Sequence, residues 1–329
     1  MKNNQIGIIG LGYWGANIIN TLEKIGFKNL HCFDINKKNS TSLKKKFKHI
    51  KTYTNLRDLL KLKLLGVIIV TDTKNHFSLA KLCIANNHNI FVEKPSTDSS
   101  KKIKELIRLA KKRKKIFMSG YIYNYNVYIE YIKKILTKKI LGQIHYVSFE
   151  RFNLGPVRND ISCIFDLAAH DLSTCIYLFK DKLKVINAHG LDLLKKNIFD
   201  MSTIILKSNK TTIEIKSSWL NPEKIRKLII VGSKKMLLFD EMDKINPIKV
   251  YNKYAEYPKI DSFKKKFFTQ QANVYYGKTF FPKINFTSPL TLEMLSFINS
   301  IKKSKKPKTD GAFSLKVMNL MEKVNNKIL

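Results

Sequence analysis

Residues 5–15 of the chain read QIGIIGLGYWG, and this stretch decides the fold. Residues 5–10 form a short apolar run rich in β-branched side chains, which is typical of a central parallel strand covered on both faces. Apolar residues with helical spacing follow over residues 17–25. The stretch therefore predicts a strand, a tight glycine turn and a helix in direct succession.

The turn carries the spacing G-x-G-x-x-G at Gly10, Gly12 and Gly15. Gly10 would allow the tight turn, Gly12 would let the backbone approach a pyrophosphate, and Gly15 would let helix and strand pack closely. The diphosphate would bind the free N–H groups at the helix N-terminus. Because the motif stands between a predicted strand and a helix, it favours a dinucleotide site over a structural glycine turn.

The residues near this loop bear on the cofactor. Asp34 ends the next predicted strand, where it can accept hydrogen bonds from the adenosine ribose, and a carboxylate there favours NAD over NADP. Lys37 and Lys38 follow closely and could accommodate a 2′-phosphate, so NADP remains possible. Tyr13 and Trp14 are bulky for such a loop, and they either line the cofactor or pack on a neighbouring domain.

Short strands and helices alternate as far as residue 123, which predicts a doubly wound parallel sheet. Beyond it, closely spaced strand patterns separated by turn signals predict a large, mainly antiparallel sheet. We therefore expect an α/β fold, with a Rossmann dinucleotide-binding domain at 1–123 and an α+β substrate-binding and oligomerisation domain at 124–329. Further helices are predicted at residues 127–137, 161–179, 290–302 and 312–329, and residues 246–289 show no assignable pattern.

The chain carries 61 Lys and Arg against 25 Asp and Glu, a formal net charge of +36. Lysine dominates, and phosphate-binding surfaces usually draw heavily on arginine. The lysine runs also lack interleaved aromatic residues for base stacking. We therefore expect no specific nucleic-acid partner, while a functional basic patch and compositional drift both remain open as explanations of the lysine content.

Four cysteines have no disulfide or metal-binding spacing, so we expect buried thiols and no metal site. A strand pattern begins within five residues of Met1, which leaves no room for a signal peptide. No apolar run reaches the length of about 18 residues that a membrane span needs. We expect a cytoplasmic protein without a membrane partner.

Three further strings follow the glycine loop in order: residues 67–76 (VIIVTDTKNH), 93–95 (EKP) and 166–171 (DLAAHD). Together they resemble the Gfo/Idh/MocA family of glucose-fructose oxidoreductases and inositol dehydrogenases. The resemblance runs over essentially the whole chain, including residues 219–226 and 288–290. It implies an NAD(P)-dependent oxidoreductase that acts on CH–OH groups.

The resemblance also implies roles for individual residues. Lys94 matches the lysine of E-K-P, which in the family lies beside the nicotinamide and the reacting hydroxyl. Asp166 and His170 match D-x-x-x-H, in which the histidine is the usual acid/base and the aspartate contacts substrate. The family pattern further places Thr71, His76 and Glu93 at the cofactor.

The chemistry is consistent with these roles. When a hydride leaves the carbon of an alcohol, a base with a pKa near neutrality must take the hydroxyl proton, and histidine suits this task. Asp166 and His170 are four residues apart on a predicted helix and so share a face, although Asp171 could instead orient the histidine. The Lys94 ammonium would stabilise alkoxide character. Without the other motifs, a solvated lysine and a surface Asp–His pair would be the ordinary interpretations.

Three positions depart from the family pattern or add to it. Tyr121 stands where many members have a histidine, which puts a second proton relay in doubt, and it is a candidate substrate contact. Arg151 and Arg158 are either contacts for a carboxylate or phosphate of the substrate or members of structural ion pairs. The stretch 150–160 resembles a subset acting on sugars and nucleotide-activated sugars.

The leading hypothesis is therefore a dehydrogenase that transfers a hydride between a ring hydroxyl of a sugar, inositol or nucleotide sugar and NAD(P). The alternative is a non-catalytic Rossmann-fold protein that senses a dinucleotide or sugar. A nucleic-acid-associated protein is a third possibility that rests on charge alone. An open antiparallel sheet usually has its outer face covered, and subunit pairing is a common way to cover it. The resemblance implies a homodimer or homotetramer.

Overall fold

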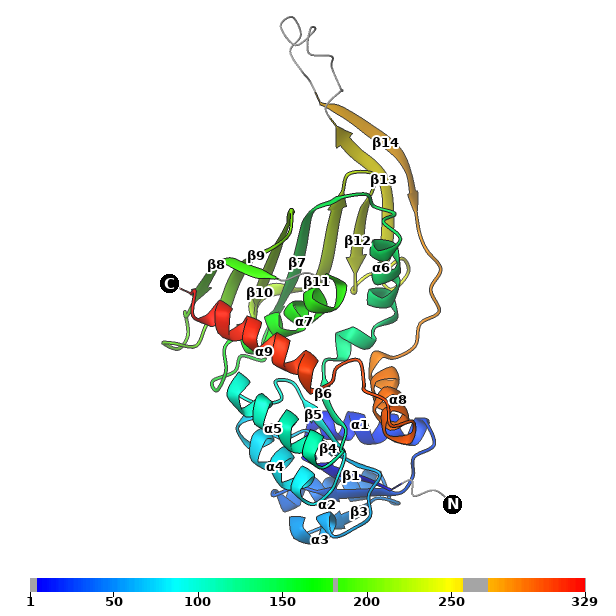
Figure 1. Cartoon of the computed structure of the whole chain (residues 1–329), viewed down its shortest axis with the longest axis vertical. Helices are drawn as coiled ribbons and strands as arrows, with labels where there is room; N and C mark the ends of the chain where they lie inside the picture. The colour runs from blue at the N-terminus through cyan, green and yellow to red at the C-terminus, as the bar shows by residue number, and fades with distance from the viewer. Residues whose placement is uncertain (1–4, 180–182, 257–271, 329) are drawn as a thin grey trace, which may run out of the picture. The chain divides into compact units, whose positions relative to one another are not determined.

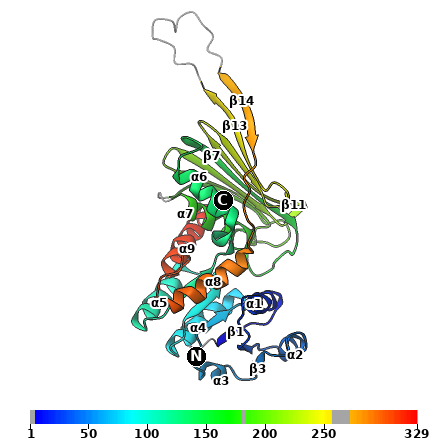
Figure 2. The same ribbon diagram turned by 90° about the vertical axis from the view of Figure 1, so that its right-hand side faces the viewer.

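A computed structural model describes residues 5–179, 183–256 and 272–328, which form two compact units. The first unit comprises residues 1–126 and 286–322, and the second comprises residues 127–285 and 323–329. Each unit contains one large sheet (Figures 1 and 2). The predicted fold class is confirmed.

The sheet of the first unit has six parallel strands in the order β3-β2-β1-β4-β5-β6. Dinucleotides bind such doubly wound sheets at the carboxyl edge where the strand order reverses, here between β1 and β4. The central strands are apolar and completely buried, as their sequences predict. The strands are β1 (Ile6–Ile9), β2 (Leu30–Phe33), β3 (Lys51–Tyr53), β4 (Gly66–Ile69), β5 (Ile90–Glu93) and β6 (Phe117–Gly120).

Helices cover both faces of this sheet. Helices α4 and α5 pack together as one layer, and α1 packs with α8 in the other (Figure 1). The helices are α1 (Tyr13–Lys24), α2 (Lys37–Lys46), α3 (Leu56–Leu60), α4 (Thr73–Ala85), α5 (Ser100–Lys112), the 3-10 helix η1 (Ile122–Tyr125), α8 (Pro289–Lys302) and α9 (Gly311–Asn325).

Helix α8 and most of α9 belong to the first unit, whereas the predicted domain boundary assigned all residues after 123 to the second. The reason is the apolar face of α8. Phe297 contacts Phe91 of β5 edge-to-face, and a side chain at Gly66 would come within 2.8 Å of the Phe297 ring. Because this packing completes the first unit's core, the unit is built from two separate stretches of chain.

The second unit has an eight-stranded sheet in the order β14-β13-β12-β11-β7-β10-β9-β8. Its neighbouring strands are antiparallel except β7 and β10, which pair in parallel. Two strands, β13 and β14, lie in the region for which the sequence pattern predicted nothing. The strands are β7 (Ile144–Leu154), β8 (Lys184–Leu191), β9 (Met201–Ser208), β10 (Thr211–Ser218), β11 (Leu220–Gly232), β12 (Met236–Asp240), β13 (Ile248–Glu256) and β14 (Asn273–Phe280).

One face of this sheet is covered by α6 (Val127–Thr137) and α7 (Ala169–Leu178), as Figure 2 shows. The two helices are joined by a hydrogen bond from the Tyr177 hydroxyl to Glu130 at 2.7 Å, and Tyr128 of α6 packs on Phe239 of β12. The expected helix over residues 161–179 is in fact two elements, because a π-helical turn (Ile164–Ala168) precedes α7.

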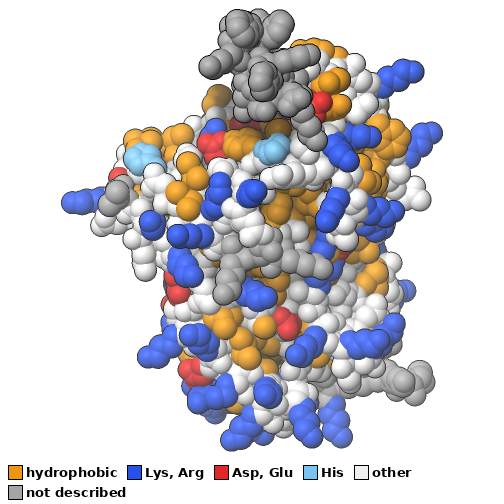
Figure 3. Space-filling view, turned by 45° about the horizontal axis from the view of Figure 1, so that its top comes forward, with side chains coloured by type: hydrophobic (Ala, Val, Ile, Leu, Met, Phe, Trp, Pro, Cys, Tyr) orange, Lys and Arg blue, Asp and Glu red, His pale blue; other side chains and the backbone are white. Residues whose placement is uncertain are grey.

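The four cysteines are buried and unpaired by disulfides, as expected. Within the described ranges, no helix combines the length and apolar character needed to cross a bilayer. The same ranges contain no cluster of three or more His, Cys, Asp or Glu side chains able to hold a metal ion. On the face drawn in Figure 3, Lys and Arg side chains are scattered rather than gathered into one patch.

Candidate functional site

The glycine loop has the geometry that a dinucleotide requires. Gly10 has φ +98°, and a side chain there would meet the Val70 carbonyl at 2.6 Å. A side chain at Gly15 would collide with the Gly10 carbonyl oxygen. A side chain at Gly12, by contrast, would meet no atom of the chain within 4 Å. Gly10 and Gly15 thus shape the turn, while Gly12 leaves open space at the N-terminus of α1, where an anion is stabilised.

Asp34 is fixed at the end of β2 by three donors. Its Oδ2 accepts from the Leu11 amide at 2.6 Å and the Asn39 amide group at 3.1 Å, and its Oδ1 accepts from the Asn36 amide at 2.7 Å. The carboxylate therefore joins the glycine loop to the start of α2. Its orientation is set before any ligand arrives.

Thr71 and His76 belong to the loop and helix that follow β4. Thr71 is half-buried, and its backbone N lies beside Gly10. The His76 imidazole is buried between the carbonyl oxygens of Pro95 and Thr71, at 2.8 and 2.9 Å. His76 therefore connects the loops after β4 and β5, and its place at the cofactor stays a prediction.

Glu93 organises the end of β5. Its Oε1 accepts from the Trp14 indole N–H at 2.5 Å, and its Oε2 accepts from the Lys94 backbone N–H at 3.0 Å. A side chain at Gly120 would come within 2.9 Å of the Glu93 carboxyl, so β6 can approach only because that residue is glycine. Burial raises the pKa of Glu93, and the hydrogen bonds from Trp14 and Lys94 oppose that rise. Trp14 is thus bonded to the E-K-P motif, whereas Tyr13 is 83% exposed.

Glu293 of α8 is a further carboxyl that the sequence analysis missed. It is fully buried, and within the described part of the chain neither of its oxygens has a hydrogen-bond partner. Burial, reinforced by the nearby Glu93 carboxyl, raises its pKa well above the usual value. Burial therefore favours the neutral form of the Glu293 carboxyl. The available signal was a glutamate on the apolar face of a helix, between Leu290 and Phe297.

Asp166 and His170 lie in the second unit, on either side of the junction between the π turn and α7. Both are half-buried. The π turn holds more residues per turn than an α-helix, so the simple four-residue face-sharing argument does not hold there. Single π turns are frequent at functional sites. The His170 carbonyl accepts hydrogen bonds from the hydroxyls of Ser173 and Thr174, at 2.7 and 2.9 Å, which anchor the first turn of α7.

The two predicted arginines are both paired with carboxylates. Arg151 is buried and holds Asp171 through two hydrogen bonds, at 2.8 and 2.6 Å. Asp171 is therefore engaged with Arg151. Arg158 holds Asp160 in the same bidentate manner, at 2.9 and 2.6 Å, and its second terminal nitrogen lies 3.9 Å from Asp166. The structural ion pair is the alternative that the geometry favours for Arg151.

Tyr121 lies inside the first unit rather than on a surface open to substrate. Its side chain is completely buried and packs edge-to-face on Phe313 of α9, with ring centroids 5.7 Å apart. Burial raises the pKa of its hydroxyl, so the group stays protonated. Because its side chain is buried, the structure gives no support to Tyr121 as a substrate contact. The sequence around Tyr121 does not reveal this burial.

Lys94 lies in the first unit and His170 in the second, so the convergence of these two groups on one substrate oxygen stays a prediction. The residues predicted to bind the cofactor all lie in the first unit, around the carboxyl ends of β1, β2, β4 and β5. The open space at Gly12 and the oriented Asp34 fit a dinucleotide.

Residues 4–121 match the family model described as "Oxidoreductase family, NAD-binding Rossmann fold". The match covers the first stretch of the first unit, which is similar over these residues to the NAD-binding domain of the Gfo/Idh/MocA family.

Two curated relatives with similar sequences are named as dehydrogenases. The chain is 26% identical over 192 residues to UDP-N-acetylglucosamine 3-dehydrogenase of Acidithiobacillus ferrooxidans, a match spanning 58% of this chain and 59% of that protein. A solved structure of the same enzyme has TM-score 0.79 at 22% identity and covers 98% of this chain and 97% of that one, which shows the shared fold. Over 130 residues, or 38% of each chain, this protein is 27% identical to scyllo-inositol 2-dehydrogenase (NAD(+)) of Bacillus subtilis.

Proposed function

We propose that the protein is an NAD-dependent dehydrogenase that transfers a hydride between a ring hydroxyl of a sugar, inositol or nucleotide sugar and the nicotinamide. The observation that carries the proposal is the glycine loop, open at Gly12 and joined through Asp34 to the start of α2. Two relatives named as dehydrogenases of a nucleotide sugar and an inositol support this substrate class.

The cofactor, when bound, supplies the hydride acceptor. The proton of the substrate hydroxyl goes to His170, the one candidate base whose ordinary pKa lies near neutrality. The Lys94 ammonium stabilises the negative charge that develops on the oxygen as the proton leaves. Asp166, the third residue of the π turn in the second unit, contacts a neighbouring substrate hydroxyl.

Glu93 positions Lys94 in this mechanism. It binds the Lys94 backbone N–H and the Trp14 indole with its two different oxygens. Because Trp14 stands in the glycine loop, this bridge links the residue that stabilises the alkoxide to the loop that holds the pyrophosphate. A shift of the glycine loop would therefore also shift the backbone of Lys94.

The test is turnover by Lys94→Ala and His170→Ala, with nicotinamide absorbance followed over a panel of sugars, inositols and nucleotide sugars. We expect each variant to lose about 10²–10⁴-fold in kcat and to keep NADH binding. The exposed Lys74→Ala and His189→Ala serve as matched controls and should retain full activity. Full activity in both site variants would remove the mechanism, and NADH binding by the unaltered protein without turnover of any substrate would favour a sensor.

We further propose that the protein is cytoplasmic and works as a homodimer or homotetramer. Its four buried, unpaired thiols suit a reducing compartment. The edge strand β14 exposes Val274, Tyr276 and Phe280, apolar groups that assembly would cover. Sedimentation of the purified protein should give at least a dimer, and a monomer at micromolar concentration would refute this part.

A further inference from the structure

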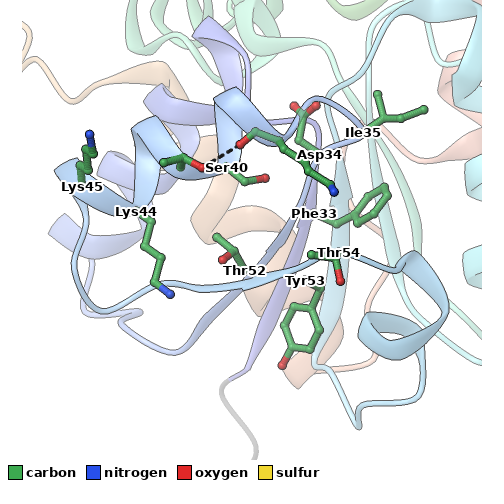
Figure 4. A pocket seen from close by; sticks show the side chains of 11 residues that line it. Phe33, Asp34, Ile35, Ser40, Lys44, Lys45, Thr52, Tyr53 and Thr54 are labelled. Atoms are coloured by element: carbon green, nitrogen blue, oxygen red, sulfur yellow. Dashed lines mark hydrogen bonds between the residues drawn. The ribbon is translucent and has the colours of Figure 1, made fainter.

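The pocket drawn in Figure 4 has a volume of about 470 Å³ and lies beside Asp34 at the end of β2. The adenosine ribose is expected there, so this pocket belongs to the candidate cofactor site. The second unit contains a separate pocket of about 320 Å³. Small-molecule sites span about 300–1,000 Å³. The second-unit pocket is lined by residues of α6, of the turn before β12, and of β13 and β14, namely Tyr131, Ile135, Ile140, Lys235, Val250, Asn252, Lys278 and Phe280.

One wall of the second-unit pocket is held by backbone contacts. The Lys234 amide, in the turn before β12, donates to the Leu141 carbonyl at 3.0 Å. A side chain at Gly232 would collide with the same carbonyl oxygen, so the two segments are in close contact. This contact holds Lys235 beside the segment that carries Ile140.

Another wall contains a β-bulge, where the register of β13 and β14 shifts between Tyr251 and Lys253. At this point Gly277 and Lys278 of β14 together oppose Asn252 of β13. A side chain at Gly277 would come within 2.5 Å of the Asn252 side-chain nitrogen, so the glycine permits the close approach of the two strands. Bulges redirect side chains, and here both Asn252 and Lys278 line the pocket.

The second-unit pocket combines positive charge with apolar side chains. Ile135 and Val250 are its most buried lining residues, at 4% and 6% exposure, whereas the Phe280 ring is 59% exposed. Lys235 and Lys278 bring two ammonium groups, and none of the described lining residues is acidic. Within the described part of the chain, neither lysine forms an ion pair. The pocket therefore complements a ligand that has an anionic group and an apolar body.

We propose that this pocket binds a small amphipathic carboxylate. Such a group presents two oxygens, one for each of the ammonium groups of Lys235 and Lys278. The apolar body of the ligand packs on Ile135, Val250 and Phe280. The site lies in the second unit, and it is distinct from the dinucleotide loop of the first unit.

The experiment is isothermal titration calorimetry of the full-length protein with sodium octanoate at neutral pH. Two matched probes separate the parts of the ligand, because octanol has the apolar body without the charge and acetate has the charge without the body. We expect octanoate to bind with a dissociation constant below about 1 mM. Octanol should bind about 10-fold more weakly, and acetate at least about 100-fold more weakly.

Two double variants test the assigned lysines. Lys235→Gln/Lys278→Gln should weaken octanoate binding about 10-fold and leave octanol binding unchanged. The control Lys234→Gln/Lys283→Gln removes the same charge from exposed lysines of the second unit that do not line the pocket, and it should change octanoate binding only slightly. Equal losses in the two double variants would overturn the proposal, because they would show only a general effect of charge.

Three further results would also overturn it. The first is no binding of octanoate at about 1 mM. The second is displacement of octanoate by NADH, which would place the ligand at the dinucleotide loop. The third is dissociation of an oligomer by octanoate in sedimentation, which would show that a second copy of the chain covers Phe280 and occupies the pocket. Failure to bind NADH would refute the proposed function instead and would leave octanoate binding unchanged.

Discussion

The two units handle polar groups in opposite ways. Around the glycine loop of the first unit, the polar groups are mainly backbone N–H groups. Gly12 leaves open space beside them, and two neighbouring backbone amides donate to Asp34. Around α7, the second unit offers side chains that already bind each other, as in the pairs Arg151–Asp171 and Arg158–Asp160. The shape of the candidate cofactor site therefore depends on backbone conformation, whereas the charge of the candidate substrate region depends on which side chains form ion pairs.

The largest effect is expected from breaking the buried pair of the second unit. Arg151→Ala leaves Asp171 buried without its partner, which should lower the free energy of unfolding by about 3–5 kcal/mol. Thermal or urea unfolding measures this loss. The half-exposed Arg158→Ala is the matched control and should cost at most about 1 kcal/mol. Equal losses in the two variants would contradict the contrast between buried and exposed pairs.

A smaller effect, on binding alone, is expected in the first unit. Gly12→Ala adds a methyl group where the chain leaves space, so stability should stay nearly constant while NADH affinity falls on the order of 100-fold, because the pyrophosphate is displaced. Gly15→Ala should lower both affinity and stability, since its methyl group meets the Gly10 carbonyl. Unchanged NADH affinity in Gly12→Ala would contradict the proposed path of the cofactor.

The smallest effect concerns pH. The pKa of Glu293 is raised in the folded protein above its usual 4.5, so above that pH the unfolded chain releases a proton that the folded chain retains. Stability contributed by the neutral acid is therefore lost as pH rises from about 4.5 toward the folded pKa, by at most about 1.4 kcal/mol per pH unit.

Glu293→Gln cannot ionise, and it should remove this slope. Unfolding measured between pH 4 and 8 would give a difference between variant and unaltered protein that grows with pH. A constant difference across that range would show that Glu293 does not titrate as inferred.

The first unit could be predicted closely because its signals are local. A β-branched run, three glycines at fixed spacing and an acid after the next strand are adjacent in sequence, and the structure confirms the turn they form. The positions of β13 and β14 escaped prediction because most of their residues lie outside the core, so their sequences show no clear apolar alternation, although each strand pairs with the strand before it. Likewise, nothing in the sequence near Arg151 reveals that Asp171 is its partner.

One predicted residue, Tyr121, and one residue that was missed, Glu293, share the same explanation. Tyr121 was expected at the substrate, but its environment is set by Phe313, which lies nearly two hundred residues later. Glu293 was missed because its proximity to Glu93 depends on how α8 returns to the first unit. Both side chains are buried by segments that are distant in sequence, and the local sequence around each residue does not predict such burial.

The return of α8 to the first unit bears on how the molecule is made. Ribosomes synthesise from the N-terminus, and a domain generally folds as a unit once its residues have emerged. Phe297 and its neighbours complete the core around Phe91. The first unit therefore cannot finish folding until almost the full length of the chain has left the ribosome. A nascent chain arrested after residue 126 should therefore remain protease-sensitive, although every strand of its sheet has already been translated.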